Sequence, residues 1–465
     1  MELNDTQRVY FVGIGGIGMA ALARFYMSKA LPVAGYDRTP SALTADLVAE
    51  GAQVSYDDSI DAIPLEFRLP EGTLAVYTPA VPADNKVLSF FRDHGFELRK
   101  RAWVLGQVTR ASKSLCFSGT HGKTTTSSMA AHILHCSEAG CNAFLGGILK
   151  GYNSNLMLSA TSPWSVVEAD EYDRSFHQLT PYIAVVNATD PDHLDIYGTE
   201  EAYLESFAHF TELIRPDGAL IVRTGLKLRP RPAEGVRVYT FGRNDGDFHA
   251  DNVRVGNGTI VFDFVHPEGR ITDIELGVPV DINVDNAVSA LAAVWLTGEL
   301  TPELARRAMA SYPGVERRFE FHLKEPGRAV IDDYAHHPDE LRQSIASVRA
   351  LYPHRKLTVA FQPHLYSRTR DFADEFADAL SAADEVILID LYPAREKPIP
   401  GISSKTIFDK VKCAQKRMIS KEDFVETMKM SNFEVLLTAG AGDLNLYVPR
   451  LVEALGRKDI AVNDR

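Results

Sequence analysis

The sequence predicts an α/β protein of three domains. Apolar runs followed by loops and helical patterns recur along the chain, which is typical of strands alternating with helices in a parallel sheet. This pattern restarts near residues 113 and 328. At roughly 100–200 residues per domain, 465 residues suit two to four domains. We expect domains at 1–110, 111–313 and 314–465, with a linker in the Pro- and Gly-containing segment 311–319.

The first domain begins with an apolar strand that enters a glycine turn at 8–16. Helical spacing follows at 17–30, and the next strands are expected at 31–37 and 72–82. The second of these strands ends in a Pro-rich loop. This first domain is expected to end near 99–110.

The turn after the first strand is a GxGxxG loop made by Gly13, Gly15 and Gly18, with Gly16 as an additional glycine. We call residues 13–18 the first glycine loop. Small residues let backbone amides and a helix N-terminus approach a pyrophosphate, and Asp37 ends the second strand, where an acid can hold a ribose hydroxyl. NAD, FAD and UDP all fit this pattern, and a tight turn without a ligand is the structural alternative.

The second domain carries another strand, glycine loop and helix at 113–136. Its loop reads GTHGKTT, and we call it the phosphate loop; it contains Gly119, Thr120, His121, Gly122, Lys123, Thr124 and Thr125. Amides in such a loop cradle phosphates, the lysine offsets their charge and the first threonine completes a Mg²⁺ shell. Because Phe117 occupies the position of the first glycine in GxxxxGK[ST], this loop is a shorter GxxGKT variant.

Acidic residues follow two further strands of this domain, at 162–171 and 181–193. Open parallel sheets bind ligands at the carboxyl ends of their strands, and phosphoryl transfer needs Mg²⁺, so these acids are candidate magnesium ligands. A polar rim of the sheet is the alternative, and His193 suits either a ligand or an ordinary hydrogen-bonded histidine. The candidates are Glu168, Asp170, Glu171, Asp190, Asp192, His193 and Asp195.

The third domain repeats strand, loop and helix at 328–340 and 357–372, then at 385–396 and 433–455. Two polar loops at successive strand ends indicate a binding face. Zinc is not favoured there because no thiolate or HExxH pattern accompanies the histidines. The polar residues are Asp332, Asp333, Tyr334, His336 and His337 in one loop, Gln362, His364, Tyr366, Arg368 and Arg370 in the next, and Gly440, Gly442 and Asp443 near the C-terminus.

Composition excludes several classes of function. A formal net charge of −13 argues against a general nucleic-acid or membrane-surface binder, because both need broad basic patches. The N-terminus lacks the pattern of a signal peptide, and no run of about 18 apolar residues occurs. The four cysteines form no CxxC pair, so free thiols are expected. We therefore expect a cytoplasmic protein, a monomer or a homodimer, with no nucleic-acid or membrane partner.

Taken together, the motifs resemble those of the Mur ligases over residues 8 to about 450. GIGGIGM, GTHGKTTT, EADEYDRSF, PDHLDIY, GVERRF, DDYAHHP, FQPHLYSRTRDF and GAGD occur in the family's order. The resemblance implies an N-terminal Rossmann-like UDP-binding domain, a central P-loop-type ATPase domain and a C-terminal Rossmann-like domain. GIGGIGM with FQPHLYSRTRDF points to the member that joins L-alanine to UDP-N-acetylmuramate, with ATP and Mg²⁺, through an acyl phosphate.

The resemblance also implies roles for individual residues. Lys123 would bind the transferred phosphate, and Thr124, Glu168 and His193 would ligate magnesium, so Lys123, Glu168 and His193 are the catalytic candidates. UDP would contact Gly13, Gly15, Gly16, Gly18, Asp37 and Thr78. ATP would contact the phosphate loop together with Asn283, Asn286, Arg317, Asp333 and His336. Alanine would contact Tyr334, His364 and Arg368.

Two positions depart from the family pattern. Ile282 precedes Asn283 where the family often has histidine, and Leu365 follows His364 where it often has arginine. Other interpretations stay open on the sequence alone: an NAD-dependent oxidoreductase, a non-catalytic nucleotide-binding regulator, and the recycling ligase that joins a tripeptide to UDP-N-acetylmuramate. The oxidoreductase interpretation leaves the phosphate loop and the acidic strand ends unexplained.

Overall fold

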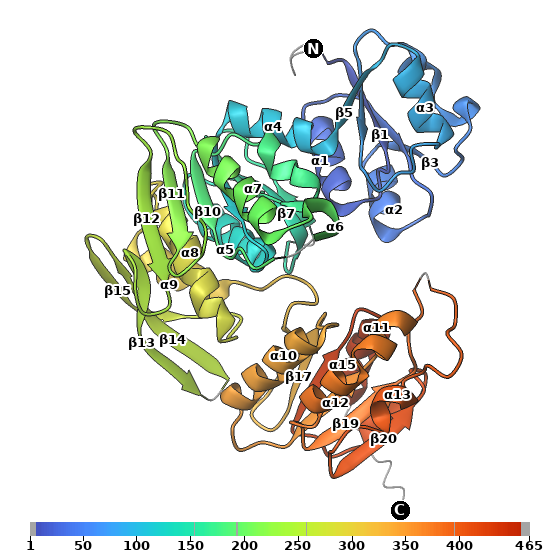
Figure 1. Ribbon diagram of the computed structural model, residues 1–465, viewed down its shortest axis with the longest axis vertical. Helices are drawn as coiled ribbons and strands as arrows, with labels where there is room; N and C mark the ends of the chain where they lie inside the picture. The colour runs from blue at the N-terminus through green and yellow to red at the C-terminus, as the bar shows by residue number, and fades with distance from the viewer. Residues whose placement is uncertain (1–5, 153, 192–193, 257, 395, 457–465) are drawn as a thin grey trace, which may run out of the picture. The chain divides into compact units, whose positions relative to one another are not determined.

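The computed structural model describes residues 6–152, 154–191, 194–256, 258–394 and 396–456 (Figure 1). The strands form three sheets of five, ten and six strands. The chain folds into two compact units, which we describe separately. The first unit is Met1–Asn252 with Phe262–Ile274 and Val284–Tyr312, and the second is Pro313–Arg465 with Val253–Val261 and Glu275–Asn283.

The first sheet has the order β3-β2-β1-β4-β5 and is parallel throughout its paired strands. Apolar residues of α3 cover one face, and those of α1 and α4 cover the other, as expected for strands buried on both sides. The strands are β1 Arg8–Val12, β2 Val33–Tyr36, β3 Gln53–Ser55, β4 Thr73–Tyr77 and β5 Glu97–Lys100; the helices are α1 Ile17–Ser28, α2 Ala42–Ala49, α3 Lys86–Asp93 and α4 Arg101–Ala111.

The second sheet has the order β15-β14-β13-β12-β11-β10-β6-β9-β7-β8. Its middle strands β10, β6 and β9 are parallel and almost wholly buried. The strands are β6 Lys113–Ser118, β7 Asn142–Leu149, β8 Ser154–Met157, β9 Trp164–Glu168, β10 Ile183–Val186, β11 Ala219–Arg223, β12 Arg237–Gly242, β13 Phe248–Gly256, β14 Thr259–His266 and β15 Gly269–Glu275.

The helices that accompany this sheet include α5, which starts directly after the phosphate loop and is packed against β7 and β9. Buried aromatic side chains of α7 pack on the 3-10 helix η4 that follows β9. The helical segments are α5 Lys123–His135, η4 Tyr172–Gln178, α6 Leu194–Tyr197, α7 Glu200–Glu212, α8 Ile282–Trp295 and α9 Pro302–Ser311.

The third sheet has the order β16-β17-β21-β18-β19-β20, and only β16 pairs in antiparallel fashion. The strands are β16 Glu320–Lys324, β17 Ala329–Asp333, β18 Leu357–Phe361, β19 Glu385–Ile389, β20 Gln415–Ile419 and β21 Val435–Ala439. The helical segments are α10 Pro338–Leu351, α11 Tyr366–Asp371, α12 Ala373–Leu380, α13 Lys405–Phe408, α14 Phe424–Met430, η5 Leu444–Tyr447 and α15 Val448–Gly456.

The predicted α/β class is confirmed, and each strand and helix expected from the glycine-loop and strand-end patterns is present. The stretch 237–275 forms four strands, β12 to β15, which were not predicted from the sequence. Among the described residues, no helix is long and apolar enough to cross a membrane.

Candidate active site

The first glycine loop brings together the residues that the sequence selected for UDP. Gly13 has φ +91°, and a Cβ on it would lie 2.8 Å from Thr78, just past the end of β4. The Gly15 N–H donates to Asp37 Oδ2 at 2.7 Å, and a Cβ on Gly15 would lie 2.9 Å from that oxygen. The left-handed backbone therefore favours glycine at position 13, and a side chain at position 15 would force Asp37 or Thr44 to shift.

Arg101, at the start of α4, is a site residue that sequence reasoning missed. A Cβ on Gly18 would lie 2.9 Å from an Arg101 guanidinium nitrogen, so the arginine lies directly against the first glycine loop. Another guanidinium nitrogen lies 4.0 Å from Asp170 in the segment after β9. A guanidinium at a pyrophosphate-type loop suits an anionic ligand. The only available signal was a basic pair at the start of a helix.

The phosphate loop has the backbone geometry of an anion cradle. Gly119 and Gly122 have φ +134° and +81°, and Gly122 is the N-cap of α5. The Thr120 hydroxyl donates to the carbonyl of Asp190 at 2.7 Å, which fixes the loop to the end of β10. Amide groups at the start of α5 therefore face the end of the parallel sheet, where phosphate binding is expected.

Lys123, the first residue of α5, forms an ion pair with Glu171. Its ammonium donates to Glu171 Oε1 at 2.9 Å and lies 2.8 Å from Oε2, and it also donates to the Gly119 carbonyl at 2.8 Å. The Glu171 side chain is 1% exposed and the Lys123 side chain 14%. The lysine is therefore held by the loop and by a buried carboxylate.

Thr124 and Glu168 lie together beside the phosphate loop. Burial raises the pKa of Glu168, and this effect is opposed by a hydrogen bond from Thr124 and by the charge of Lys123. The Gly146 N–H of β7 also donates to Glu168 Oε2 at 3.1 Å. A hydroxyl and a carboxylate are oxygen donors of the kind that Mg²⁺ prefers, so these two residues fit the ion.

The remaining central-domain candidates lie in different environments. Asn286 packs against the phosphate loop, because its Oδ1 would lie 2.7 Å from a Cβ on Gly122. In the second unit, Asn283 donates to the carbonyl of Val278 at 3.1 Å. His193 lies outside the described residues, so its predicted magnesium role stays a prediction.

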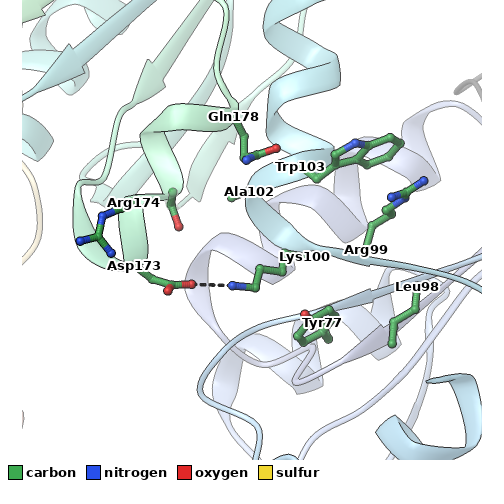
Figure 2. Close-up of a pocket in the computed structure, with 10 residues that line it drawn as sticks. Tyr77, Leu98, Arg99, Lys100, Ala102, Trp103, Asp173, Arg174 and Gln178 are labelled. Carbon is green, nitrogen blue, oxygen red and sulfur yellow. Dashed lines mark hydrogen bonds and ion pairs between the residues drawn. The ribbon is translucent and has the colours of Figure 1, made fainter. Parts of the chain in front are cut away.

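The turn after Glu171 contains two consecutive left-handed residues. Asp173 and Arg174 have φ +52° and +54°, a conformation that costs non-glycine residues about 1–3 kcal/mol each. Asp173 pairs with Lys100 of β5 at 2.9 Å (Figure 2), and the Arg174 guanidinium lies 4.7 Å from the ring centre of Tyr197. These contacts hold the strained turn in place.

This turn borders a cavity of about 290 Å³. Figure 2 shows Lys100 reaching Asp173 across one side of it. The lining residues are Tyr77, Leu98, Arg99, Lys100, Ala102, Trp103, Asp173, Arg174, Ser175 and Gln178.

In the second unit, five predicted residues lie in one group, which we call the third-domain cluster: Arg317, Tyr334, His336, His364 and Arg368. The Arg317 guanidinium lies 4.5 Å from the ring centre of Tyr334, whose ring is 5.2 Å from that of His336. The rings of His336 and His364 are 6.4 Å apart, and Arg368 Nη1 lies 3.5 Å from His364 Nδ1. Aromatic, imidazole and guanidinium groups thus share one site.

Two of the residues predicted to contact ATP form hydrogen bonds within the second unit. Arg317 donates to the carbonyls of Gly440 and Gly442 at 2.8 and 3.1 Å. Asp333 is half-buried and accepts a hydrogen bond from Ser344. The glycine turn near the C-terminus therefore has a structural contact with a predicted site residue.

His336 has the electrostatic setting of a neutral imidazole. Burial lowers its pKa, although Glu340 and a hydrogen bond to the Tyr334 carbonyl oppose this shift. A histidine with a lowered pKa is unprotonated at neutral pH and can accept a proton. This residue therefore has the chemistry of a base.

Leu365, one of the two departures from the expected pattern, has φ +70° at the start of α11. Its backbone N–H donates to the carbonyl of Tyr392 at 3.0 Å. This contact fixes the loop between His364 and Arg368.

Three family models match consecutive parts of the chain. They are the Mur ligase family catalytic domain at residues 8–113, the Mur ligase middle domain at 117–294 and the Mur ligase glutamate ligase domain at 317–448.

Curated relatives and solved structures agree with these models. The UDP-N-acetylmuramate–L-alanine ligase of Phocaeicola vulgatus is 56% identical over 98% of this chain and 100% of its own length, and that of Porphyromonas gingivalis is 48% identical over 95% and 97%. The crystal structure of UDP-N-acetylmuramate–alanine ligase from Thermotoga maritima has 28% identity and a TM-score of 0.79, covering 96% of this chain and 98% of that one. A murein peptide ligase from Psychrobacter arcticus, 20% identical with a TM-score of 0.63 over 97% and 99%, shares the fold. The chain belongs to the Mur ligase family.

Proposed function

We propose that this protein joins L-alanine to the lactyl carboxylate of UDP-N-acetylmuramate, with cleavage of ATP, in peptidoglycan precursor synthesis. The observation that carries the proposal is the grouping of Lys123, Thr124 and Glu168 at the phosphate loop, in the same compact unit as the first glycine loop. Two relatives with this activity in their names are 56% and 48% identical over nearly the whole chain, which supports the choice of substrates.

We assign residues 1–110 to a domain that binds the UDP substrate and residues 111–313 to a domain that binds ATP. Residues 314–465 would form a domain that binds alanine and closes over ATP. In the first domain, the first glycine loop, Asp37 and Thr78 would hold the UDP part, and Arg101 is an added candidate for its anionic groups. In the second, the phosphate loop and Asn286 would hold ATP. In the third, Tyr334, His364 and Arg368 would hold alanine.

The proposed reaction proceeds in two steps. The lactyl carboxylate attacks the γ-phosphate of ATP to give an acyl phosphate and ADP, and Lys123 offsets the charge on the transferred group. Magnesium, held by Thr124 and Glu168 and by His193 at a second site, would neutralise phosphate charge. The amine of alanine then attacks the acyl carbon, and phosphate leaves as the amide forms. His336, neutral because of its burial, is a candidate to accept the amine proton.

Release of phosphate from ATP tests the proposal. The assay contains Mg²⁺ and UDP-N-acetylmuramate, and compares L-alanine, glycine, L-serine, a tripeptide and no amino acid. We expect the fastest release with L-alanine, together with the matching amide in mass spectrometry. Release only with the tripeptide would make the protein a recycling ligase, and no release with any acceptor would refute ligase activity.

A further inference from the structure

The Lys123–Glu171 ion pair affects how nucleotide phosphates can bind, and Glu171 has no role in the reaction proposed above. Glu171 belongs to the group of acids that the sequence associated with magnesium. Its carboxylate instead contacts the phosphate-loop lysine, with both oxygens within 2.9 Å of the ammonium nitrogen.

An ammonium group has three N–H donors. Lys123 uses one on the Gly119 carbonyl and one on Glu171, and its side chain is 14% exposed. A phosphate that binds in the loop must therefore either share the ammonium with Glu171 or displace it. Both alternatives bring phosphate charge close to a buried carboxylate.

The backbone of Glu171 is held in place by two hydrogen bonds. Its backbone carbonyl accepts hydrogen bonds from the Tyr197 hydroxyl at 2.5 Å and from the N–H of Arg174 at 2.9 Å. A carboxylate that is 1% exposed and anchored at its backbone keeps its charge near the loop.

We propose that Glu171 is an internal anion that competes with nucleotide phosphates for Lys123. It is a positioning residue that acts through the lysine. In the nucleotide-free protein it neutralises the ammonium, and in the complex its like charge weakens the hold on the phosphates. The competition favours release of ADP after the reaction. This inference rests on the proposed nucleotide site.

The test is the affinity for Mg²⁺·ADP, measured by titration calorimetry on the full chain. Glu171→Gln keeps the size of the side chain and removes its charge, so we expect a dissociation constant at least threefold lower than that of the wild type. A residue with only a structural role would not tighten binding when it is replaced. Glu171→Leu, which removes the charge with an apolar side chain, should also tighten binding, so the test does not depend on one variant folding.

Asp173→Asn is the matched control. It removes a carboxylate from the same turn that pairs with Lys100 instead of Lys123, and its ADP affinity should equal that of the wild type.

The outcomes separate the two proposals. Wild-type protein that binds no Mg²⁺·ADP would overturn the nucleotide site and this inference with it. Wild-type binding that is unchanged or weaker in both Glu171 variants would overturn the competition alone. Tightening that is equally large in Asp173→Asn would also overturn it, because the effect would then not depend on the carboxylate that contacts Lys123.

Discussion

Replacing Lys123 by alanine should destabilise the nucleotide-free protein, because it leaves Glu171 buried without its partner. Removing one member of a buried ion pair costs about 3–5 kcal/mol. Since the Lys123 side chain retains 14% exposure, water can partly reach the vacated space, and we expect a loss near the lower limit, about 3 kcal/mol. For a domain of about 200 residues, 1 kcal/mol lowers Tm by roughly 2–4 °C, which gives a decrease of about 6–12 °C.

The measurement is a thermal melt without nucleotide, followed by circular dichroism. The double variant Lys123→Ala/Glu171→Gln removes the unpaired charge and should recover at least half of the lost stability. If Lys123→Ala melts within about 2 °C of the wild type, Glu171 is solvated well enough without the lysine and the reasoning is wrong. The double variant also allows loss of turnover to be measured on a protein whose folding is restored.

Three further predictions concern other parts of the first unit. Gly146→Ala should lower the rate of phosphate release at least about tenfold, because the new methyl group would lie 2.2 Å from Glu168 Oε2. A steady-state assay with a Mg²⁺ titration measures this rate, and normal turnover would contradict the prediction. Phe176→Ala should lower the free energy of unfolding in urea by about 3–5 kcal/mol, because the centre of this fully buried ring lies 5.0–5.2 Å from those of two other phenylalanine rings. A loss below about 1 kcal/mol would show that neighbouring side chains fill the space and that the reasoning is wrong. Burial lowers the pKa of His132 from 6.5 to about 4, so the unfolded chain binds its proton first and stability falls as pH decreases through that range. The expected loss is about 3 kcal/mol at pH 4, and His132→Gln should flatten the pH dependence of urea unfolding; an equally steep dependence in the variant would exclude His132 as its source.

The local part of the site could be predicted from sequence. Glycine loops that follow apolar strands fix both their backbone conformation and their place at the end of a parallel sheet, so Gly13 and Thr78, or Gly15 and Asp37, meet as expected. The same rule brings the third-domain cluster together, because its two polar loops follow β17 and β18, which both pair with β21 in parallel.

The missed contacts depend on distant parts of the chain. Arg101 meets the first glycine loop from the start of α4, and Gly146 reaches Glu168 from β7, which was not predicted as a strand. Glu171 looked like one more acid at a strand end, and its pairing with Lys123 became evident only from the fold. Residue type and spacing do not determine which of several neighbouring acids turns towards a lysine 48 positions earlier.

The contact between Gly146 and Glu168 has a consequence for how sequences in this family diverge. A Cβ at position 146 would overlap the carboxylate, so the two positions are constrained together although they are 22 residues apart. In relatives that retain the acid at this place beside the phosphate loop, we expect no side chain to be accepted at the position of Gly146. Where the acid has been replaced during evolution, the glycine should become free to vary. An alignment column for this strand glycine would then show whether the acid opposite it, the proposed magnesium ligand, is retained.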